Sequence, residues 1–170
     1  EHGKEVLISA FPFFHIAGYL IGLFLPFIKG TQTLIANPRD TDHIINELID
    51  KKPLSFGNVP TLFLMIMKNP KAKEIPDELL DNITLYVSGA APFPEEAIRD
   101  FEKFFHAQNK FVEVYGMTET SPLATANPAL KPKKIGTVGL PLPDTEVKII
   151  DIDTGKELGI GEPGEILIKG

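Results

Sequence analysis

The sequence predicts an α/β fold, in which a parallel sheet is flanked by helices and followed by part of a small antiparallel β-barrel. Up to about residue 128, short apolar segments typical of buried strands alternate with longer segments of helical periodicity. After residue 129, glycine and proline interrupt the chain, and strand-like alternation replaces the helical pattern. We therefore predict an α/β unit at residues 1–128 and a partial β unit at residues 129–170.

The elements of the α/β unit follow one another as strand and helix. The predicted strands are Glu5–Ala10, Thr31–Ala36, Leu54–Gly57, Ile83–Ser88 and one that begins at Phe111. The predicted helices are Phe14–Ile28, one capped by Asp40 or Thr41 and stopped by Pro53, one from about Thr61 to Lys68, and one that starts at Pro94. Phenylalanines on the last helix have helical spacing, which is typical of core packing.

The β unit contains two predicted strands. Glu146–Ile152 alternates as a strand, Asp153–Gly155 turns the chain, and Glu165–Lys169 forms another strand. No helix fits this part of the sequence, so we expect the two strands to pair as antiparallel neighbours.

Composition excludes several classes of function. Hydrophobic residues make up 43% of the 170 residues and charged residues 24%, which are ordinary values for a globular protein. The net charge of −6 disfavours nucleic-acid binding through a broad cationic face, and the cluster Lys131, Lys133 and Lys134 is typical of a solvated loop. The chain has no cysteine, which excludes disulfides and thiolate metal sites and fits a reducing cytoplasm.

The sequence contains no predicted signal peptide or membrane anchor. Its longest apolar run, Phe13 to Ile28, is interrupted by polar and helix-breaking residues and is too short to span a bilayer, so we predict a buried helix there. The chain starts at Glu1 without methionine, enters a strand almost immediately, and stops at Gly170 directly after another strand. We expect both ends to be cut from a longer protein.

The segment Phe111–Pro122 (FVEVYGMTETSP) carries most of the chemistry. It begins as a buried strand and ends in small and polar residues, at the sheet edge where open α/β sheets bind ligands. Tyr115 can stack on a flat base, and Gly116 lets the backbone approach a ligand. Thr118 offers a hydroxyl to an anion, and Glu119 is an oxygen ligand suited to Mg²⁺. The alternative interpretation is a capped turn with a solvated glutamate.

Four segments in this order resemble the adenylate-forming (AMP-binding) superfamily, which includes acyl-CoA synthetases, luciferases and peptide-synthetase adenylation domains. They are FPFFHIAG (11–18), VSGAAP (87–92), VYGMTETSP (114–122) and GEPGEILIKG (161–170), and IGTVGLPLPDTEVKI (135–149) is similar to the connecting strand segment of the family. The resemblance is greatest to fatty-acyl-CoA synthetases. It implies a flavodoxin-like half of the family's N-terminal domain.

The resemblance implies an activity and a set of site residues. Such enzymes use ATP to convert a carboxylate to an acyl-adenylate and pyrophosphate, and then transfer the acyl group to CoA. Gly89, Ala90, Ala91 and Pro92 would form the nucleotide-binding segment with adenine against the first three, and Tyr115 would stack on the base. Thr118 would contact the α-phosphate, Glu119 would hold Mg²⁺, and Gly116 and Met117 would border the acyl carboxylate.

The acid side of the site is implied by the first motif. His15 would border the acyl pocket and orient the carboxylate, although a lone histidine at the start of an apolar helix is otherwise typical of a core or cap residue. Amino-acid-activating members carry an aspartate in this motif, and FPFFHIAG has none. The resemblance therefore favours an uncharged acyl tail, with the remaining candidate pocket walls at Ala17, Gly18, Val59 and Thr61.

The 170 residues lack several parts of the family pattern. The phosphate loop would precede Glu1, and the ribose-binding aspartate and the C-terminal lid with its catalytic lysine would follow Gly170. Because that lid must rotate to complete both half-reactions, we predict that the 170 residues alone are inactive.

Other readings of the same residues remain open. The chain could be a non-catalytic adenine-nucleotide-binding module, an adenylating enzyme for an aromatic or other acid, or a flavodoxin-like domain with an unrelated ligand. Thr118 and Glu119 argue against the non-catalytic module, because adenine binding alone needs neither a metal ligand nor a phosphate contact. The predicted partners are small molecules (ATP, a carboxylic acid and CoA), and any membrane association would come through the acyl substrate.

Overall fold

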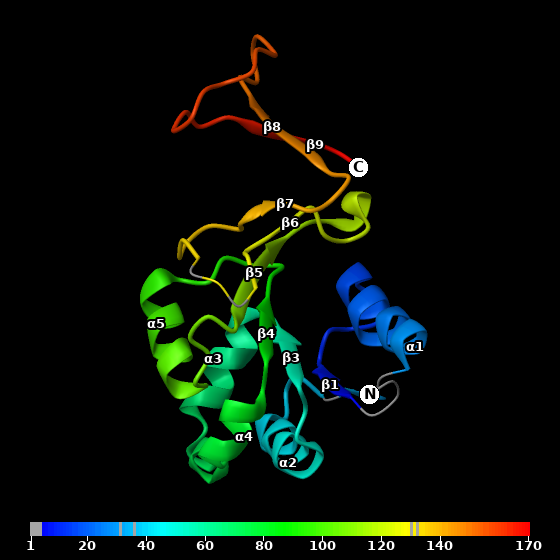
Figure 1. The fold of residues 1–170 in the computed structure, drawn as a ribbon, viewed down its shortest axis with the longest axis vertical. Coiled ribbons are helices and arrows are strands. Elements are labelled where there is room, and N and C mark those ends of the chain that lie inside the picture. Colours follow the sequence, from blue (N-terminus) through cyan, green and yellow to red (C-terminus); the bar gives the residue numbers. More distant parts are fainter. Residues whose placement is uncertain (1–4, 31, 36, 130, 132) are drawn as a thin grey trace.

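The computed structural model describes residues 5–30, 32–35, 37–129, 131 and 133–170. Within these residues, the main sheet has seven strands in the order β2-β1-β3-β4-β5-β6-β7 (Figure 1). Strands β1 to β5 pair in parallel, and β6 and β7 add to one edge as short antiparallel strands. The strands are Val6–Ser9 (β1), Gln32–Ile35 (β2), Ser55–Asn58 (β3), Leu85–Ser88 (β4), Phe111–Tyr115 (β5), Thr125–Ala126 (β6) and Leu140–Pro141 (β7).

Helices connect the parallel strands, so the predicted α/β class is confirmed. They are the π-helix η1 (Gly18–Phe24), α1 (Leu25–Lys29), α2 (Thr41–Lys51), α3 (Pro60–Lys68), the 3₁₀ helix η2 (Pro70–Glu74), α4 (Asp77–Asn82), α5 (Glu95–Phe104) and the 3₁₀ turn η3 (Thr118–Thr120). Sequence patterns did not predict η2 or α4, because helices of five or six residues complete less than two turns and have no clear period.

One face of the sheet packs against α2, α3 and α5 (Figure 1). Ile8, Phe56, Tyr86 and Phe111 stand side by side in register on this face, and all four are buried. Aromatic rings of the helices meet them edge to face, as Phe63 does with Phe56 at a centroid distance of 5.0 Å. These offset contacts add to the stabilisation that burial of apolar area provides.

The opposite face of the sheet is covered by the helix that contains η1 and α1 (Figure 1). Helical residues begin at Ile16 rather than at the predicted Phe14. The helix packs closely on the chain before it, since a Cβ at Gly18 would lie 2.1 Å from the Pro12 carbonyl oxygen. Only one side of the helix is buried, and Phe27 on the other side is 85% exposed. The prediction of a buried helix therefore holds for only one of its faces.

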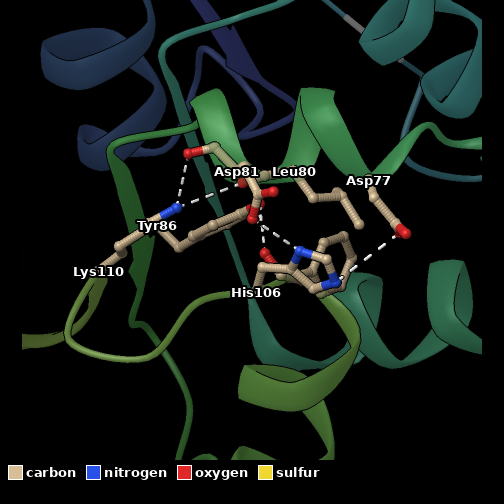
Figure 2. Close-up of polar contacts among 7 residues, drawn as sticks. Asp77, Leu80, Asp81, Tyr86, His106 and Lys110 are labelled. Atoms are coloured by element: carbon tan, nitrogen blue, oxygen red, sulfur yellow. Dashed lines mark hydrogen bonds and ion pairs between the residues drawn. The ribbon is translucent and has the colours of Figure 1, made fainter.

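A group of polar contacts joins α4 to the segment between α5 and β5 (Figure 2). It lies at the amino ends of β4 and β5, the opposite ends of these strands from their carboxyl ends. His106 Nδ1 lies 2.8 Å from Asp81 Oδ1, and its Nε2 lies 3.8 Å from Asp77 Oδ1. Lys110 Nζ donates to the Asp81 carbonyl oxygen at 2.8 Å. Since Asp77 and Asp81 belong to α4 and Lys110 precedes β5, these contacts hold α4 against the chain that enters β5.

Tyr86 lies beneath this network with its ring buried. Its hydroxyl donates to the Phe105 carbonyl oxygen at 3.0 Å, and burial raises the pKa of Tyr86 well above its usual range. A buried hydroxyl without such a partner would cost about 1–3 kcal/mol. The hydrogen bond therefore lets a polar side chain occupy the centre of the core.

The C-terminal part forms a separate two-stranded sheet, as the sequence predicted. Strands β8 (Glu146–Ile150) and β9 (Glu165–Lys169) pair as antiparallel neighbours in continuous register. Asp151 begins the turn that follows β8, where its carboxylate accepts from the Thr154 amide at 2.7 Å, and hydrogen bonds from Thr154 lower the pKa of Asp151. Because β7 pairs with β6, the chain beyond residue 129 first returns to the main sheet. The division at residue 128 stays a prediction.

No helix in the described residues has the length and apolar character that crossing a bilayer would require.

Candidate functional site

Two adjoining cavities lie at the carboxyl ends of β4 and β5. The first has a volume of about 260 Å³, and the second has a volume of about 310 Å³. They share Ala90, Val114 and Gly116, so the loop after β4 and the end of β5 separate them. Sequence-predicted residues that line the first cavity are His15, Ala17, Gly89, Ala90, Gly116, Met117, Thr118 and Glu119. Those that line the second are Ala90, Ala91, Pro92, Tyr115 and Gly116.

The loop after β4 approaches β5 closely at Gly89. A Cβ on Gly89 would lie 2.8 Å from the Val114 carbonyl oxygen and 2.7 Å from its Cγ2, so a side chain there would force the loop away from β5. The next residue, Ala90, has a φ of +65°, in the left-handed region that costs a non-glycine residue about 1–3 kcal/mol. The fold thus holds the backbone of this loop tightly at the wall between the two cavities.

The loop after β5 folds back on itself at Gly116, where a Cβ would lie 1.8 Å from the Pro122 carbonyl oxygen. Thr120 stabilises this turn, because its hydroxyl accepts from the Met117 amide at 2.9 Å and lies 3.0 Å from the Met117 carbonyl oxygen. The capped turn considered from the sequence is therefore present, and Thr120 is its capping residue. Thr118 and Glu119 are instead exposed and line the first cavity.

His15 combines the two roles weighed from the sequence. Its Nδ1 accepts from the Ala17 amide at 3.2 Å, which satisfies one of the backbone donors at the start of the helix. A neutral imidazole that accepts at Nδ1 carries its proton at Nε2. The same side chain lines the first cavity opposite the loop after β5, so His15 can offer that proton to a ligand.

Three of the predicted pocket residues do not line either cavity. Gly18 is buried against the backbone of Pro12, Val59 packs partly buried against the core, and Thr61 is exposed in the first turn of α3. Val59 and Thr61 follow β3 toward the side of the sheet that α3 covers, whereas the first cavity opens toward η1. The structure does not bring these three residues to the cavities.

Two polar residues of the second cavity were missed as site residues by sequence reasoning. Ser88 and Glu113 are neighbours in register on β4 and β5, and both are buried. Ser88 Oγ and Glu113 Oε2 have no hydrogen-bond partner among the described residues. A carboxylate between Val112 and Val114 in an apolar strand was the available signal, because a buried acidic residue normally needs a partner.

The environment of Glu113 opposes its ionisation. Burial raises the pKa of the Glu113 carboxyl, and this effect exceeds the opposing influence of Lys133 and of a hydrogen bond from the Gly136 amide. A carboxyl with unused hydrogen-bonding capacity at the base of a cavity can recognise a polar ligand edge.

An apolar groove continues from the first cavity along the sheet face that η1 and α1 cover. Its volume is about 360 Å³, and it shares Phe11, Ile21 and Val87 with the first cavity. The other lining residues are mostly apolar (Leu7, Pro26, Leu54, Gly57 and Leu85), with Glu5, Ser55 and Thr84 as the polar ones. The first cavity is therefore lined at one end by polar residues of the loop after β5, and at the other end it continues into the apolar groove.

A divalent cation would meet one protein carboxylate in the first cavity. Among the described residues, no group of three His, Asp or Glu side chains comes together as a metal site. Mg²⁺ is commonly held by one or two carboxylates together with substrate phosphates, and Glu119 beside Thr118 supplies that kind of donor. The residues present fit a magnesium ion that arrives with a phosphate ligand.

Comparison with known proteins identifies the family. The family of AMP-binding enzymes matches residues 1–170, which is the whole chain. The chain belongs to this family. Its adenylate-forming relatives therefore account for the ordered motifs, and the motifs at residues 11–18, 87–92 and 114–122 line the two adjoining cavities.

Individual relatives in the AMP-binding family support the same assignment. A long-chain-fatty-acid–CoA ligase of Escherichia coli O6:H1 is 33% identical over 171 residues, which cover 99% of this chain and 29% of the ligase. The ATP-bound structure of MatB from Rhodopseudomonas palustris has a TM-score of 0.85 at 28% identity, over 98% of this chain and 31% of that one. A benzoate CoA ligase from Burkholderia xenovorans LB400 has a TM-score of 0.85 at 28% identity, over 99% and 33% of the two chains. The chain thus spans about a third of the length of these proteins.

Proposed function

We propose that the full-length protein is an AMP-forming fatty-acid–CoA ligase. It would activate a carboxylic acid with ATP to an acyl-adenylate and pyrophosphate, and then transfer the acyl group to the thiol of CoA. The observation that carries the proposal is that the two cavities meet at Ala90 and Gly116, with Thr118 and Glu119 beside the junction. An acyl-adenylate that spanned the cavities would have its phosphate at this junction.

The second cavity would hold the adenine base. The base would lie against the backbone of Ala90 and Ala91, beyond Gly89 at the wall of the first cavity, and stack on the ring of Tyr115. Such stacking is worth about 1–3 kcal/mol for a base on an aromatic side chain. The Thr118 hydroxyl would donate to the α-phosphate. Glu119 would hold Mg²⁺, which when bound neutralises charge on the triphosphate as pyrophosphate leaves.

The first cavity would hold the carboxylate of the acid. His15 would orient it beside Gly116 and Met117, so that a carboxylate oxygen attacks the α-phosphorus. The new O–P bond forms as the bond to pyrophosphate breaks. In the second half-reaction the CoA thiolate attacks the acyl carbonyl carbon, the C–S bond forms, and AMP leaves with the electrons of the C–O bond.

The apolar groove supports a fatty acid as the substrate. A tail that left the first cavity past Phe11, Ile21 and Val87 would run along mostly apolar walls, in which Glu5, Ser55 and Thr84 are the polar lining residues. Each buried methylene would contribute about 0.8 kcal/mol to binding. An aromatic acid is the second candidate, because a benzoate CoA ligase has the same fold at 28% identity.

ATP–pyrophosphate exchange by the full-length protein tests the proposal. Acids from acetate to long-chain and aromatic acids would be compared at saturating ATP. We expect exchange only when an alkyl acid is present, and we expect the rate of exchange to increase with the chain length of that acid. Exchange with aromatic acids alone would favour the second candidate. A folded protein that binds ATP and exchanges with no acid would be a non-catalytic nucleotide-binding module.

The 170 residues alone are expected to produce no acyl-CoA. They span 29% of the Escherichia coli relative, and family members need a mobile lid to complete both half-reactions. Incubation of the purified 170-residue polypeptide with ATP, Mg²⁺, CoA and the acid preferred by the full-length protein checks this. Sustained thioester formation by the polypeptide would contradict the prediction.

His15→Ala in the full-length protein is expected to raise KM for the acid about tenfold and to leave KM for ATP within about twofold, because the lost hydrogen bond to a charged group is worth about 1.5–3 kcal/mol. His43→Ala, which changes an exposed histidine of α2, is the matched control. Steady-state kinetics with each substrate varied in turn measures both constants. An unchanged KM for the acid would remove His15 from the acid site.

A cytoplasmic location is part of the proposal. It is supported by the lack of cysteine, since proteins in a reducing compartment do not rely on disulfides. The proposed partners are the small-molecule substrates ATP, a carboxylic acid and CoA.

A further inference from the structure

Lys133 is buried, although its position in a lysine-rich loop predicted a solvated side chain. Its side chain is 5% exposed, whereas Lys131 and Lys134 are exposed. The ammonium donates to Glu102 Oε1 at 2.7 Å and to the Phe111 carbonyl oxygen at 2.7 Å. It also lies 4.6 Å from the centroid of the Phe111 ring, within range of a cation–π interaction. A strongly hydrated ammonium leaves water only where such contacts replace its hydration.

These contacts attach the loop to two elements of the core. Glu102 belongs to α5, and Phe111 is the first residue of β5. Three residues beyond Lys133, the chain reaches Gly136, Thr137 and Val138, which form one wall of the second cavity. The buried lysine therefore fixes the start of the segment that closes this cavity.

The other end of the same wall is fixed by side chains near β6. The Thr125 hydroxyl donates to the Val138 carbonyl oxygen at 2.7 Å, and Asn127 Nδ2 donates to the Thr137 carbonyl oxygen at 2.7 Å. Between these anchors, the Gly136 amide lies near enough to the Glu113 carboxyl at the base of the cavity to lower its pKa. The wall is thus held at both ends, and Lys133 supplies one of the attachments, beside Ile135, which packs against the core.

We propose that Lys133 is a positioning residue for the nucleotide half of the site. By holding residues 136–138 against α5 and β5, it sets the width of the second cavity and the direction of the amide that faces Glu113. This inference rests on the proposed function, in which adenine occupies the second cavity. Lys133 itself does not line that cavity, so it would act through the wall and not by contact with the ligand.

The test measures equilibrium binding of ATP to the full-length protein, a readout that does not need turnover. Lys133→Met keeps the length of the side chain and removes the charge, and Lys134→Met in the exposed neighbour is the control. We expect the Kd for ATP to rise about tenfold in Lys133→Met, since a displaced wall would weaken the fit of a base whose stacking is worth about 1–3 kcal/mol, and to stay within about twofold in the control. Lys133→Arg should recover part of the affinity.

Loss of the lysine also leaves Glu102 unpaired, which could unfold the protein. The double variant Lys133→Met with Glu102→Gln removes both charges. Its thermal unfolding is measured first, and its Kd for ATP is compared with that of the wild type once the two proteins are shown to be equally stable. A raised Kd for ATP together with an unchanged KM for the acid supports the inference. A wild-type Kd for ATP in the folded double variant, or equal changes in the ATP and acid constants, overturns it. Failure of the wild-type protein to bind ATP would instead overturn the proposed function.

Discussion

Glu119→Gln is expected to lower ATP–pyrophosphate exchange by the full-length protein at least about a hundredfold. A metal ion that stabilises the charge of the transition state contributes several kcal/mol, and about 2.7 kcal/mol already corresponds to a hundredfold in rate. Because Glu119 is exposed on η3, its replacement by an amide of the same shape should change stability by no more than about 0.5 kcal/mol. The measurement is exchange at varied Mg²⁺, with thermal unfolding of the same preparations.

The matched control is Glu96→Gln, which removes an exposed carboxylate from the first turn of α5. This variant should keep its exchange rate. If Glu119→Gln lost stability and activity in parallel, or lost no activity, the carboxylate would be a solvated turn residue and the magnesium role would be wrong.

The sequence predicted those parts of the fold that depend on local pattern. The strands and the longer helices follow from apolar periodicity, and Asp40 is the N-cap of α2, one of the two residues named for that position. Strands β6 and β7 were missed, because each has two residues and pairs only through contacts distant in sequence. Burial of Lys133 was missed for the same reason, since Glu102 and Phe111 lie far from it along the chain.

Much of the candidate site could be predicted from motifs. The motif residues that do not reach the cavities are kept away by the direction in which the chain leaves its strand or by close backbone packing. The motif residues after β4 and β5 come together because parallel strands end at one edge of the sheet. Val59 and Thr61 were chosen as pocket walls from the resemblance, which does not determine the side of the sheet on which the turn after β3 lies, and Gly18 is buried against the backbone of Pro12 instead. That geometry allows the route of the acyl tail to be tested directly.

Gly57→Leu is expected to shorten the acids that the full-length protein accepts. Gly57 lines the apolar groove in the middle of β3, and a Cβ there would lie 3.8 Å from the Phe11 ring and from Val87, which is ordinary contact. A leucine can therefore occupy the groove without moving the backbone. Its four carbons would displace about four methylenes of a long tail, which at about 0.8 kcal/mol each amounts to about 3 kcal/mol, or roughly a hundredfold in kcat/KM.

Thr61→Leu is the control that separates the two routes for the tail, because Thr61 lies exposed on α3 and was a predicted pocket wall. Exchange would be measured for both variants with acids of increasing chain length. If the tail lies in the groove, Gly57→Leu should lose exchange with long acids and keep exchange with short acids. Thr61→Leu should keep the wild-type dependence of exchange on chain length. The reverse pattern would mean that the tail passes along α3. It would leave the groove without a substrate, and the preference for fatty over aromatic acids would then lose its structural support.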